Sequence, residues 1–447
     1  MINLYHRLVY YSSVTIWRLI RDLINKNYFS TAYFIWEIYF IIFSKPKWND
    51  WHSQISNFFY FHGKISEAKN IYLAMVIKFN RKGIKEQYDL LKVRFLREFP
   101  TAIGHIAEVD NYVKMTILGA RNDSPAIMIA NETVSNNEYL AYWGKYFLII
   151  NNRVAYSLLG KIYPYIEDRI AGIKDKNDNF FVDYEHELRS KIQQMWELQK
   201  RKPLLKFENL SVNNCWNLLE ANGIPKGSKF VTLHVRCDGN FQRAARDADI
   251  STYISSILLL RKNGYYVIRS GDKKMPKIQK IEGVWDYAHS ETRSEILDIF
   301  VISKANFMIT TTSGPAWVAP TFGVPCLNTN VFPLVHRSYF HADIYITKLI
   351  KSTKEGKYLS FKEILENELF RSESIEYLNR QGYEIINNEQ DEIENAVSEM
   401  MKIISGEVFV KEQINLMNNF EENLSKYSPH KNSKISPYFA KKWSGLF

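Results

Sequence analysis

The chain has 447 residues, a length that suits two or three domains of typical size. Hydrophobic residues make up 46% of it and charged residues 24%, which is the balance of a globular protein and excludes both intrinsic disorder and a polytopic membrane protein. The formal net charge of +10 indicates anionic partners, such as phosphorylated small molecules, anionic lipid or nucleic acid.

The N-terminal part carries most of the positive charge. Its first hundred residues hold 15 Lys and Arg against 7 Asp and Glu. Residues 1–97 have helical periodicity, and the stretch 51–79 resembles a tetratricopeptide-type hairpin around Gly63. The apolar window 28–43 contains Glu37 and is shorter than the ~20 residues that span a bilayer. We predict an α-helical region over 1–97 that either packs as a bundle on the next domain or docks on a membrane or partner.

The remainder is predicted to be α/β. After Pro100, short apolar runs alternate with helical stretches, which is typical of βαβ units and a parallel sheet. A loop rich in Gly and Pro indicates a boundary, so we predict two Rossmann-like doubly wound domains over 98–222 and 223–410. The tail 411–447 is expected to pack back on the core. The expected strands are 126–130, 147–151, 230–235, 265–270, 306–312 and 325–330, and the expected helices are 250–262, 293–304, 315–322 and 390–404.

The cysteines indicate the redox environment in which the protein works. Cys215, Cys237 and Cys326 are widely spaced and form no CxxC pair or Cys/His cluster, which predicts a reducing environment and no structural zinc. No signal peptide is expected, because arginines interrupt the N-terminal apolar stretch. We therefore expect a cytoplasmic protein, with peripheral attachment to the inner face of the cytoplasmic membrane if the N-terminal region docks there.

The strand expected over 230–235 leads into the densest group of candidate residues. In doubly wound sheets, ligands bind beyond the carboxyl ends of the strands, and alternation places His234 and Arg236 on one face of this strand. An arginine fork suits the oxygens of a diphosphate. The alternative is a structural Arg–Asp pair beside a solvated basic loop. The candidates here are His234, Arg236, Arg243 and Arg246 for anion binding and Asp238 for acid–base chemistry.

Three later segments add candidates for ligand contact. Two of them follow expected strands, and the third begins an expected helix. The run TTTSGP enters a helix whose free N–H groups can face an anion. Ordinary helix capping is the alternative for all three segments. The candidates are Arg269, Gly271 and Asp272 in VIRSGD, Thr312, Ser313 and Gly314 in TTTSGP, and Ser294 and Asp298 in RSEILD.

The first half contributes fewer candidates. Gly104 and His105 lie in an expected βα loop, with Glu108 following it, and a histidine there suits proton transfer near neutral pH, although a lone loop histidine is often structural. Asn131, at the end of the next strand, is a candidate for contact with an acceptor hydroxyl. The pair Asp247 and Asp249 matches a short metal-binding pattern, but helix capping explains it better.

Taken together, the elements IGHIAEVDNY, VTLHVRCDGNFQRAARDADISTY, GYYVIRSGD, TTTSGPAWVAPTFGVPCLNTN and ISPYF resemble a family of bacterial GT-B-type glycosyltransferases of surface-polysaccharide (O-antigen and capsule) synthesis. The resemblance spans about 100 to 440. The HxR strand is also similar to the donor-binding segment of GT-B fucosyltransferases, where the arginine contacts the nucleotide diphosphate. The family resemblance implies a GT-B fold, and the similarity of the HxR strand implies that His234 and Arg236 contact the donor.

These observations lead to an expected function. The chain is expected to transfer a sugar from a nucleotide-sugar donor to a glycan or lipid-linked glycan, with the leaving diphosphate stabilised by arginines and main-chain amides, without a metal or other cofactor. The alternatives are a sugar-nucleotide epimerase of GT-B-like fold and a non-catalytic nucleotide-binding scaffold. No nucleic-acid partner is expected, because the basic residues outside the N-terminal region cluster at strand ends.

Overall fold

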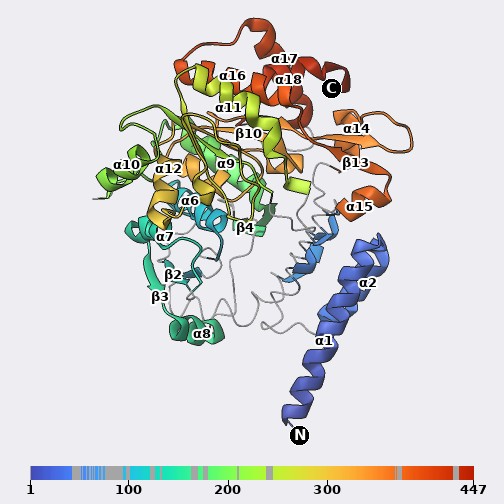
Figure 1. The fold of residues 1–447 in the computed structure, drawn as a ribbon. Helices are drawn as coiled ribbons and strands as arrows, with labels where there is room; N and C mark the ends of the chain where they lie inside the picture. The colour runs from blue at the N-terminus through green and yellow to red at the C-terminus, as the bar shows by residue number, and fades with distance from the viewer. Residues whose placement is uncertain are drawn as a thin grey trace.

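The structure is a computed structural model. It is a mixed α/β fold with one large parallel sheet and an N-terminal helical hairpin (Figure 1). The residues that it describes are 2–42, parts of 52–75, 94–96, 101–120, 126–130, 133–162, 170–174, 180–208, 211–237, 245–367, 369, 375–425 and 432–447.

The large sheet has the strand order β14-β11-β10-β9-β6-β7-β8, and all its pairs are parallel. The chain enters at β6, extends to β7 and β8 on one side, and returns to β9 on the other side. The winding therefore reverses between β6 and β9. The strands are β6 (Phe230–His234), β7 (Tyr266–Arg269), β8 (Val284–Trp285), β9 (Phe307–Thr310), β10 (Cys326–Val331), β11 (Ile344–Thr347) and β14 (Lys434–Ile435).

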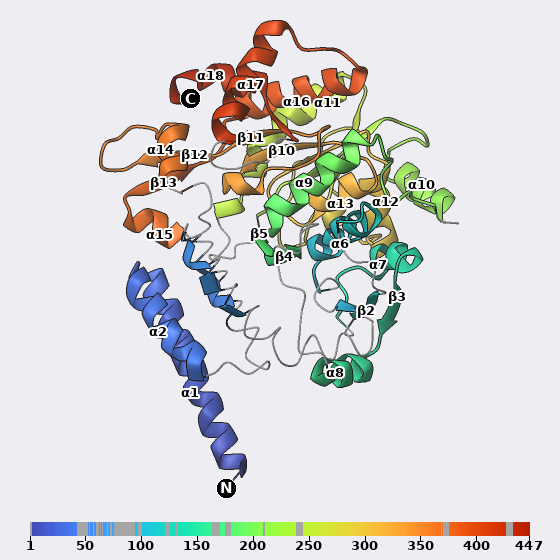
Figure 2. The ribbon, with the colours of Figure 1, turned by 180° about the vertical axis from the view of Figure 1, so that it is seen from behind.

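Helices cover both faces of this sheet (Figures 1 and 2). Alternation along β6 sends Val231 and Leu233 to one core and Phe230 to the other, as period two requires. The first core contains α11 (Ile254–Lys262), α16 (Gln390–Ser405), α17 (Lys411–Ser425) and α18 (Pro437–Lys442), and the second contains α10 (Val212–Ala221), α12 (Glu295–Ser303) and α13 (Pro315–Thr321). The strands and helices expected for residues 230–404 are thus confirmed within a few residues.

The first half forms a smaller parallel sheet of order β1-β2-β3. Its first strand lies at the end of the range 1–97 that is predicted to be α-helical, so that prediction is wrong at residues 94–96, which pair with β2. The predicted strands 126–130 and 147–151 are confirmed as β2 and β3. Its helices α6 and α7 share a hydrophobic core with α12 and α13 of the second half. The elements are β1 (Arg94–Leu96), α6 (Ile103–Ile117), β2 (Ala126–Ala130), α7 (Asn137–Tyr142), β3 (Leu148–Asn151), α8 (Arg153–Ile162) and α9 (Glu185–Leu198).

Two antiparallel pairs complete the strands. The pair β4 (Ile170–Lys174) and β5 (Phe180–Tyr184) precedes α9. The pair β12 (Leu349–Ser352) and β13 (Tyr383–Ile386) encloses α14 (Phe361–Glu366) and α15 (Ile375–Arg380) in the chain. Neither pair was expected from the sequence.

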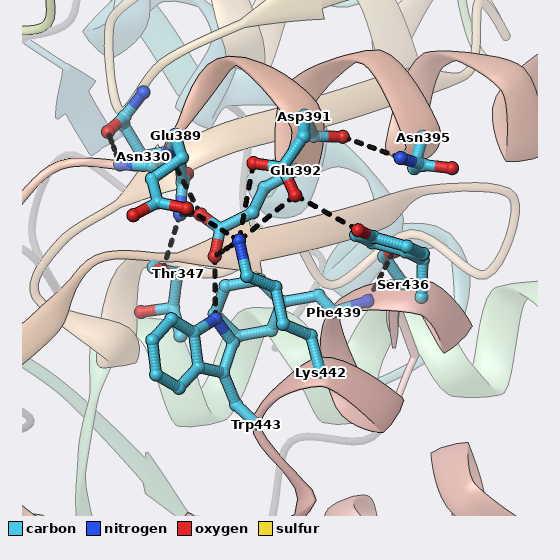
Figure 3. Close-up of polar contacts among 12 residues, drawn as sticks. Asn330, Thr347, Glu389, Asp391, Glu392, Asn395, Ser436, Phe439, Lys442 and Trp443 are labelled. Carbon is cyan, nitrogen blue, oxygen red and sulfur yellow. Dashed lines mark hydrogen bonds and ion pairs between the residues drawn. The ribbon is translucent and has the colours of Figure 1, made fainter.

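The C-terminal tail is held against α16 by a group of polar contacts (Figure 3). The Lys442 ammonium lies 2.6 Å from Glu389, 3.0 Å from Asp391 and 3.2 Å from Glu392. The Trp443 indole donates to Glu392 at 2.6 Å. One cation thus compensates the charge of the acidic first turn of α16. The helix dipole also stabilises acidic residues at this end of the helix.

The N-terminal region begins with a hairpin of α1 (Ile2–Asn25) and α2 (Phe29–Ile42). Its core also takes residues from the partly described stretch 52–75, whose described residues are helical on either side of residue 62. Gly63 lies outside the described residues, so the tetratricopeptide-type hairpin stays a prediction. Within the described part of the chain, none of the helices has the length and apolar character needed to cross a bilayer.

Candidate functional site

The candidate site begins where β6 and β9 end side by side. The main-chain N–H of Thr311 donates to the carbonyl oxygen of His234 at 3.2 Å, and the N–H of Arg236 donates to the Thr311 hydroxyl at 3.1 Å. The segments that leave the two strands are therefore fixed to one another. Ligands of doubly wound sheets bind at such a reversal of strand order.

Arg236 is joined to Asp247 across this edge. The guanidinium Nε lies 3.0 Å from the Asp247 carboxylate, and both side chains are at most 16% exposed. Asp249, the other half of the acidic pattern, accepts from the Ser251 N–H at 2.9 Å and caps a short 3-10 helix. Asp247 thus pairs with Arg236 and Asp249 caps a helix, so the capping interpretation of the acidic pattern is confirmed for Asp249.

Lys348 is a second cation at this edge, and sequence reasoning missed it. It directly follows β11 and is 3% exposed. Among the described residues its ammonium has one hydrogen-bond partner, the main-chain carbonyl oxygen of Asp247 at 2.6 Å, and no carboxylate forms an ion pair with it. Burial lowers the pKa of Lys348 to about 8. The charge of Asp247 raises the Lys348 pKa, but by less than burial lowers it, so a further anion at this place would offset the cost of the buried charge.

Lys348 and Asp247 border a cavity of about 460 Å³ beyond the strand ends. The cavity combines apolar walls with amides and carboxylates, a mixture typical of small-molecule sites. Next to it, Asn330 and Asn388 exchange main-chain-to-side-chain hydrogen bonds at 2.6 and 2.8 Å, which holds the segment after β13 on the sheet. The remaining lining residues are Cys237, Ala245, Ala248, Asp249, Ile250, Pro276, Ile375, Asn379, Glu384, Ile385 and Asn387.

The helix α15 connects this cavity to the N-terminal hairpin. Ile375 and Asn379 line the cavity. On the same helix, the Tyr377 ring lies 6.1 Å from the Phe29 ring, and Arg380 donates to the carbonyl oxygen of Asn25. One short helix therefore contacts both the cavity and the turn between α1 and α2.

His234 and Arg269 form the buried interior of the site. Burial, together with Arg269 and Arg236, lowers the pKa of His234 to about 4, so its imidazole is neutral near pH 7. Arg269 is fully buried and pairs with Asp286 at 3.1 Å. His234 Nδ1, Arg269 Nε and Ser270 Oγ are buried and have no hydrogen-bond partner among the described residues. Arg269 thus holds the loop after β7, while His234 keeps an unused polar atom.

The other candidates of the second half have structural contacts. Gly271 has φ +155°, and the exposed Asp272 accepts from the Lys274 N–H at 2.8 Å. Ser294 caps α12 through the Leu297 N–H. Asp298 accepts from the Tyr287 hydroxyl at 2.7 Å, and burial raises the Asp298 pKa. Thr312 accepts from the Phe332 N–H at 3.2 Å, and Ser313 lies 3.2 Å from the Thr310 hydroxyl.

Gly314 joins the two halves of the molecule. A Cβ built on Gly104 of α6 would lie 2.9 Å from the Gly314 Cα, so the helices touch through their glycines. This contact places the first turn of α6, with His105, beside the segment that follows β9. The prediction of a βα loop here is wrong, because His105 lies in the first turn of α6. His105 is half-buried, with Nδ1 3.3 Å from the Thr101 hydroxyl. Glu108, one turn further on, is paired with Arg189 at 3.0 Å.

The structure therefore brings part of the predicted site together. Arg236 and His234 lie at the reversal point, and His105 approaches from the first half. Arg246 is described and half-buried. Asp238, Arg243 and Asn131 lie outside the described residues. Lys348 could have been found by the rule of strand carboxyl ends, had 344–347 been predicted as a strand.

No family model matches the chain. No curated protein matches it either. Among solved structures, it is similar to a glycosyl transferase family 9 protein of Veillonella parvula, with 10% identity and a TM-score of 0.42 over 69% of this chain and 96% of that one. The chain is also similar to Escherichia coli ADP-heptose LPS heptosyltransferase II, with 10% identity and a TM-score of 0.34 over 53% of this chain and 84% of that one. It is similar as well to the UDP-GlcNAc 2-epimerase of Methanocaldococcus jannaschii, with 13% identity and a TM-score of 0.23 over 77% of this chain and 82% of that one.

Proposed function

We propose that this protein is a glycosyltransferase that moves a sugar from a nucleotide-sugar donor to a glycan or lipid-linked glycan acceptor in bacterial surface-polysaccharide synthesis. One observation carries the donor part of the proposal. Two buried cations, Arg236 and Lys348, meet at Asp247 beside a 460 Å³ cavity where the winding of the sheet reverses. A nucleoside diphosphate supplies both the anion for the cations and a nucleoside of suitable size for the cavity.

The reaction needs charge stabilisation on the leaving side. The bond between the anomeric carbon and the diphosphate oxygen breaks, and negative charge develops on the diphosphate. Fixed cations in a water-poor site stabilise such charge strongly. We assign this role to Arg236 and Lys348, and the proposal includes no metal ion.

The acceptor side needs a proton acceptor if the reaction inverts the anomeric centre. The acceptor hydroxyl oxygen bonds to the anomeric carbon, and its proton passes to a base. Of the three candidates by residue type, Glu108 is engaged by Arg189 and Asp238 lies outside the described residues. We assign the role to His105, because the Gly104–Gly314 contact sets it beside the strand ends of the second half.

The test is nucleotide binding by the full chain, measured as a shift in melting temperature with the diphosphates UDP, GDP, ADP and dTDP and the monophosphate CMP, with and without EDTA. Binding to the folded form alone stabilises it by about 2.7 kcal/mol at a hundredfold excess over Kd. We expect one diphosphate to give a shift that survives EDTA and disappears in Arg236→Gln. A chain that no diphosphate stabilises contradicts the proposal.

Asp247→Asn is the matched control, because it breaks the same ion pair and keeps the cation. We expect it to retain the diphosphate shift, whereas an equal loss in both variants would mean that Arg236 acts only on structure. Turnover then separates the classes of protein. A glycosyltransferase needs an acceptor, an epimerase converts the nucleotide sugar without one, and a scaffold binds without turnover.

A further inference from the structure

The helix α2 has a second apolar face that nothing in the described structure covers. Its inner face buries Trp36, Tyr39 and Phe40 in the core of the N-terminal region. At 100° per residue, positions i, i+4, i+7 and i+8 share the opposite side. That side, the outer face of α2, carries four large apolar residues, which are Phe34 (61% exposed), Ile38 (46%), Ile41 (71%) and Ile42 (62%).

This concentration differs from ordinary surface exposure. Single exposed apolar residues are common on soluble proteins, but a contiguous group indicates an interaction site. Glu37 is the one charged residue of α2, and it lies at the margin of the outer face. The turn between the two helices lies against α15, and the hairpin runs away from the large sheet from there (Figures 1 and 2). The outer face is therefore placed for contact with a large external surface.

The outer face of α2 could contact a second copy of this chain or a lipid surface, and the charge of the N-terminal region favours the lipid surface. The first hundred residues have an excess of eight positive charges, 15 against 7. Two copies meeting through this region would bring like charges together, which opposes association. An anionic lipid surface attracts the same charge, by about 1 kcal/mol per Lys or Arg near the membrane. At 1.5 Å per residue, the 14 residues of α2 extend about 21 Å, which is shorter than the ~30 Å hydrocarbon core of a bilayer, so α2 would lie along the interface and not span it.

We propose that the outer face of α2 docks this protein on an anionic lipid bilayer, with Phe34, Ile38, Ile41 and Ile42 entering the boundary between headgroups and acyl chains. The basic residues of the region hold the protein at the charged surface, and the apolar face supplies the insertion. This docking is independent of sugar transfer and stands whether or not the donor site is correct.

The experiment is flotation of the full-length chain with vesicles of phosphatidylcholine alone or with about one third phosphatidylglycerol. We expect binding to the anionic vesicles that weakens as salt is raised and is weaker on neutral vesicles. Ile38→Ser combined with Ile41→Ser removes apolar surface without adding charge. We expect this variant to bind anionic vesicles at least tenfold more weakly, because each isoleucine contributes substantially on burial.

Val408→Ser combined with Val410→Ser is the matched control, because these valines are 84% and 62% exposed at a site distant in sequence. It should bind vesicles like the unmodified chain. Both variants change exposed positions, so an unchanged melting temperature verifies folding. Equal binding by the two variants, or no binding to anionic vesicles, overturns the proposal. A dimer that the α2 variant converts to monomer, in light scattering after gel filtration, overturns it in favour of a second copy. The vesicles contain no nucleotide, so this result is separate from the diphosphate test.

Discussion

At the scale of single residues, Lys348 should make the proposed donor site sensitive to pH. Its ammonium is buried without an ion pair in the described structure, and burial lowers its pKa to about 8. Because the charged form binds the diphosphate, affinity should fall as pH rises through about 8. The bound anion should in turn raise the pKa of Lys348 and move the decline to higher pH.

Lys348→Arg and Lys348→Met test this dependence. Arginine stays charged throughout this range, so the arginine variant should lose the decline above pH 8. The methionine variant should bind diphosphate at least tenfold more weakly at pH 7. Its ligand-free melting temperature should be unchanged or higher, because a buried unpaired charge is removed. Titration calorimetry between pH 6.5 and 9.5 measures the affinities, and identical pH profiles for all three proteins would exclude a role for Lys348.

The residue scale also shows what the sequence could reveal of the site. Alternation along one strand was sufficient to place His234 and Arg236 at a strand end. The ion pair with Asp247 and the position of Lys348 needed the fold, because 101 residues separate Lys348 from Asp247 in the chain. Arg269 is a strand-end residue too, yet its guanidinium is fully buried on Asp286. The strand-end rule finds positions and does not say which way a side chain turns.

At the scale of elements, the contact between α6 and α13 depends on two glycines. A Cβ on Gly104 would lie 2.9 Å from the Gly314 Cα, which is backbone and cannot swing aside. Alanine is favoured over glycine in a helix by up to about 1 kcal/mol, but overpacking costs about 1–3 kcal/mol. We expect Gly104→Ala to lower the unfolding free energy by about 1–2 kcal/mol in denaturant titration.

Gly144→Ala is the control for this substitution. A Cβ there would meet only the Ile149 Cδ1 atom, at 3.9 Å, so stability should change little. If both variants lost the same unfolding free energy, the close approach of α6 and α13 would not be the cause of the loss in Gly104→Ala.

Elements with regular patterns could be predicted, and those with mixed patterns could not. The runs that became β2, β6 and β9 are short and mostly apolar, and they are bounded by turn residues, as buried parallel strands require. The segment IYITKLIKS became two strands, β11 and β12, separated by Lys348. Its lysines obscured the alternation, and its pairing with β13 depends on residues more than 30 positions away.

At the scale of the whole molecule, the two sheets are connected through one core. Ile106 and Trp143 of the first half lie in the same cluster as Phe300 and Val318 of the second. We expect hydrogen exchange of the Gly104→Ala variant to accelerate together in β2 and β6, because loosening this core exposes both sheets. Faster exchange in β2 with unchanged exchange in β6 would show that the halves open separately.

The position of α15 has a consequence for the molecule as a whole. Its residues contact the hairpin through Tyr377 and Arg380 and the cavity through Ile375 and Asn379. Any displacement of this helix therefore alters both places at once. A ligand that favours one position of α15 changes the affinity at the other place, and thermodynamic reciprocity requires the same factor in both directions. If attachment at a surface moves α15, this six-residue helix would couple that attachment to the affinity of the cavity for its ligand, although neither binding event requires the other.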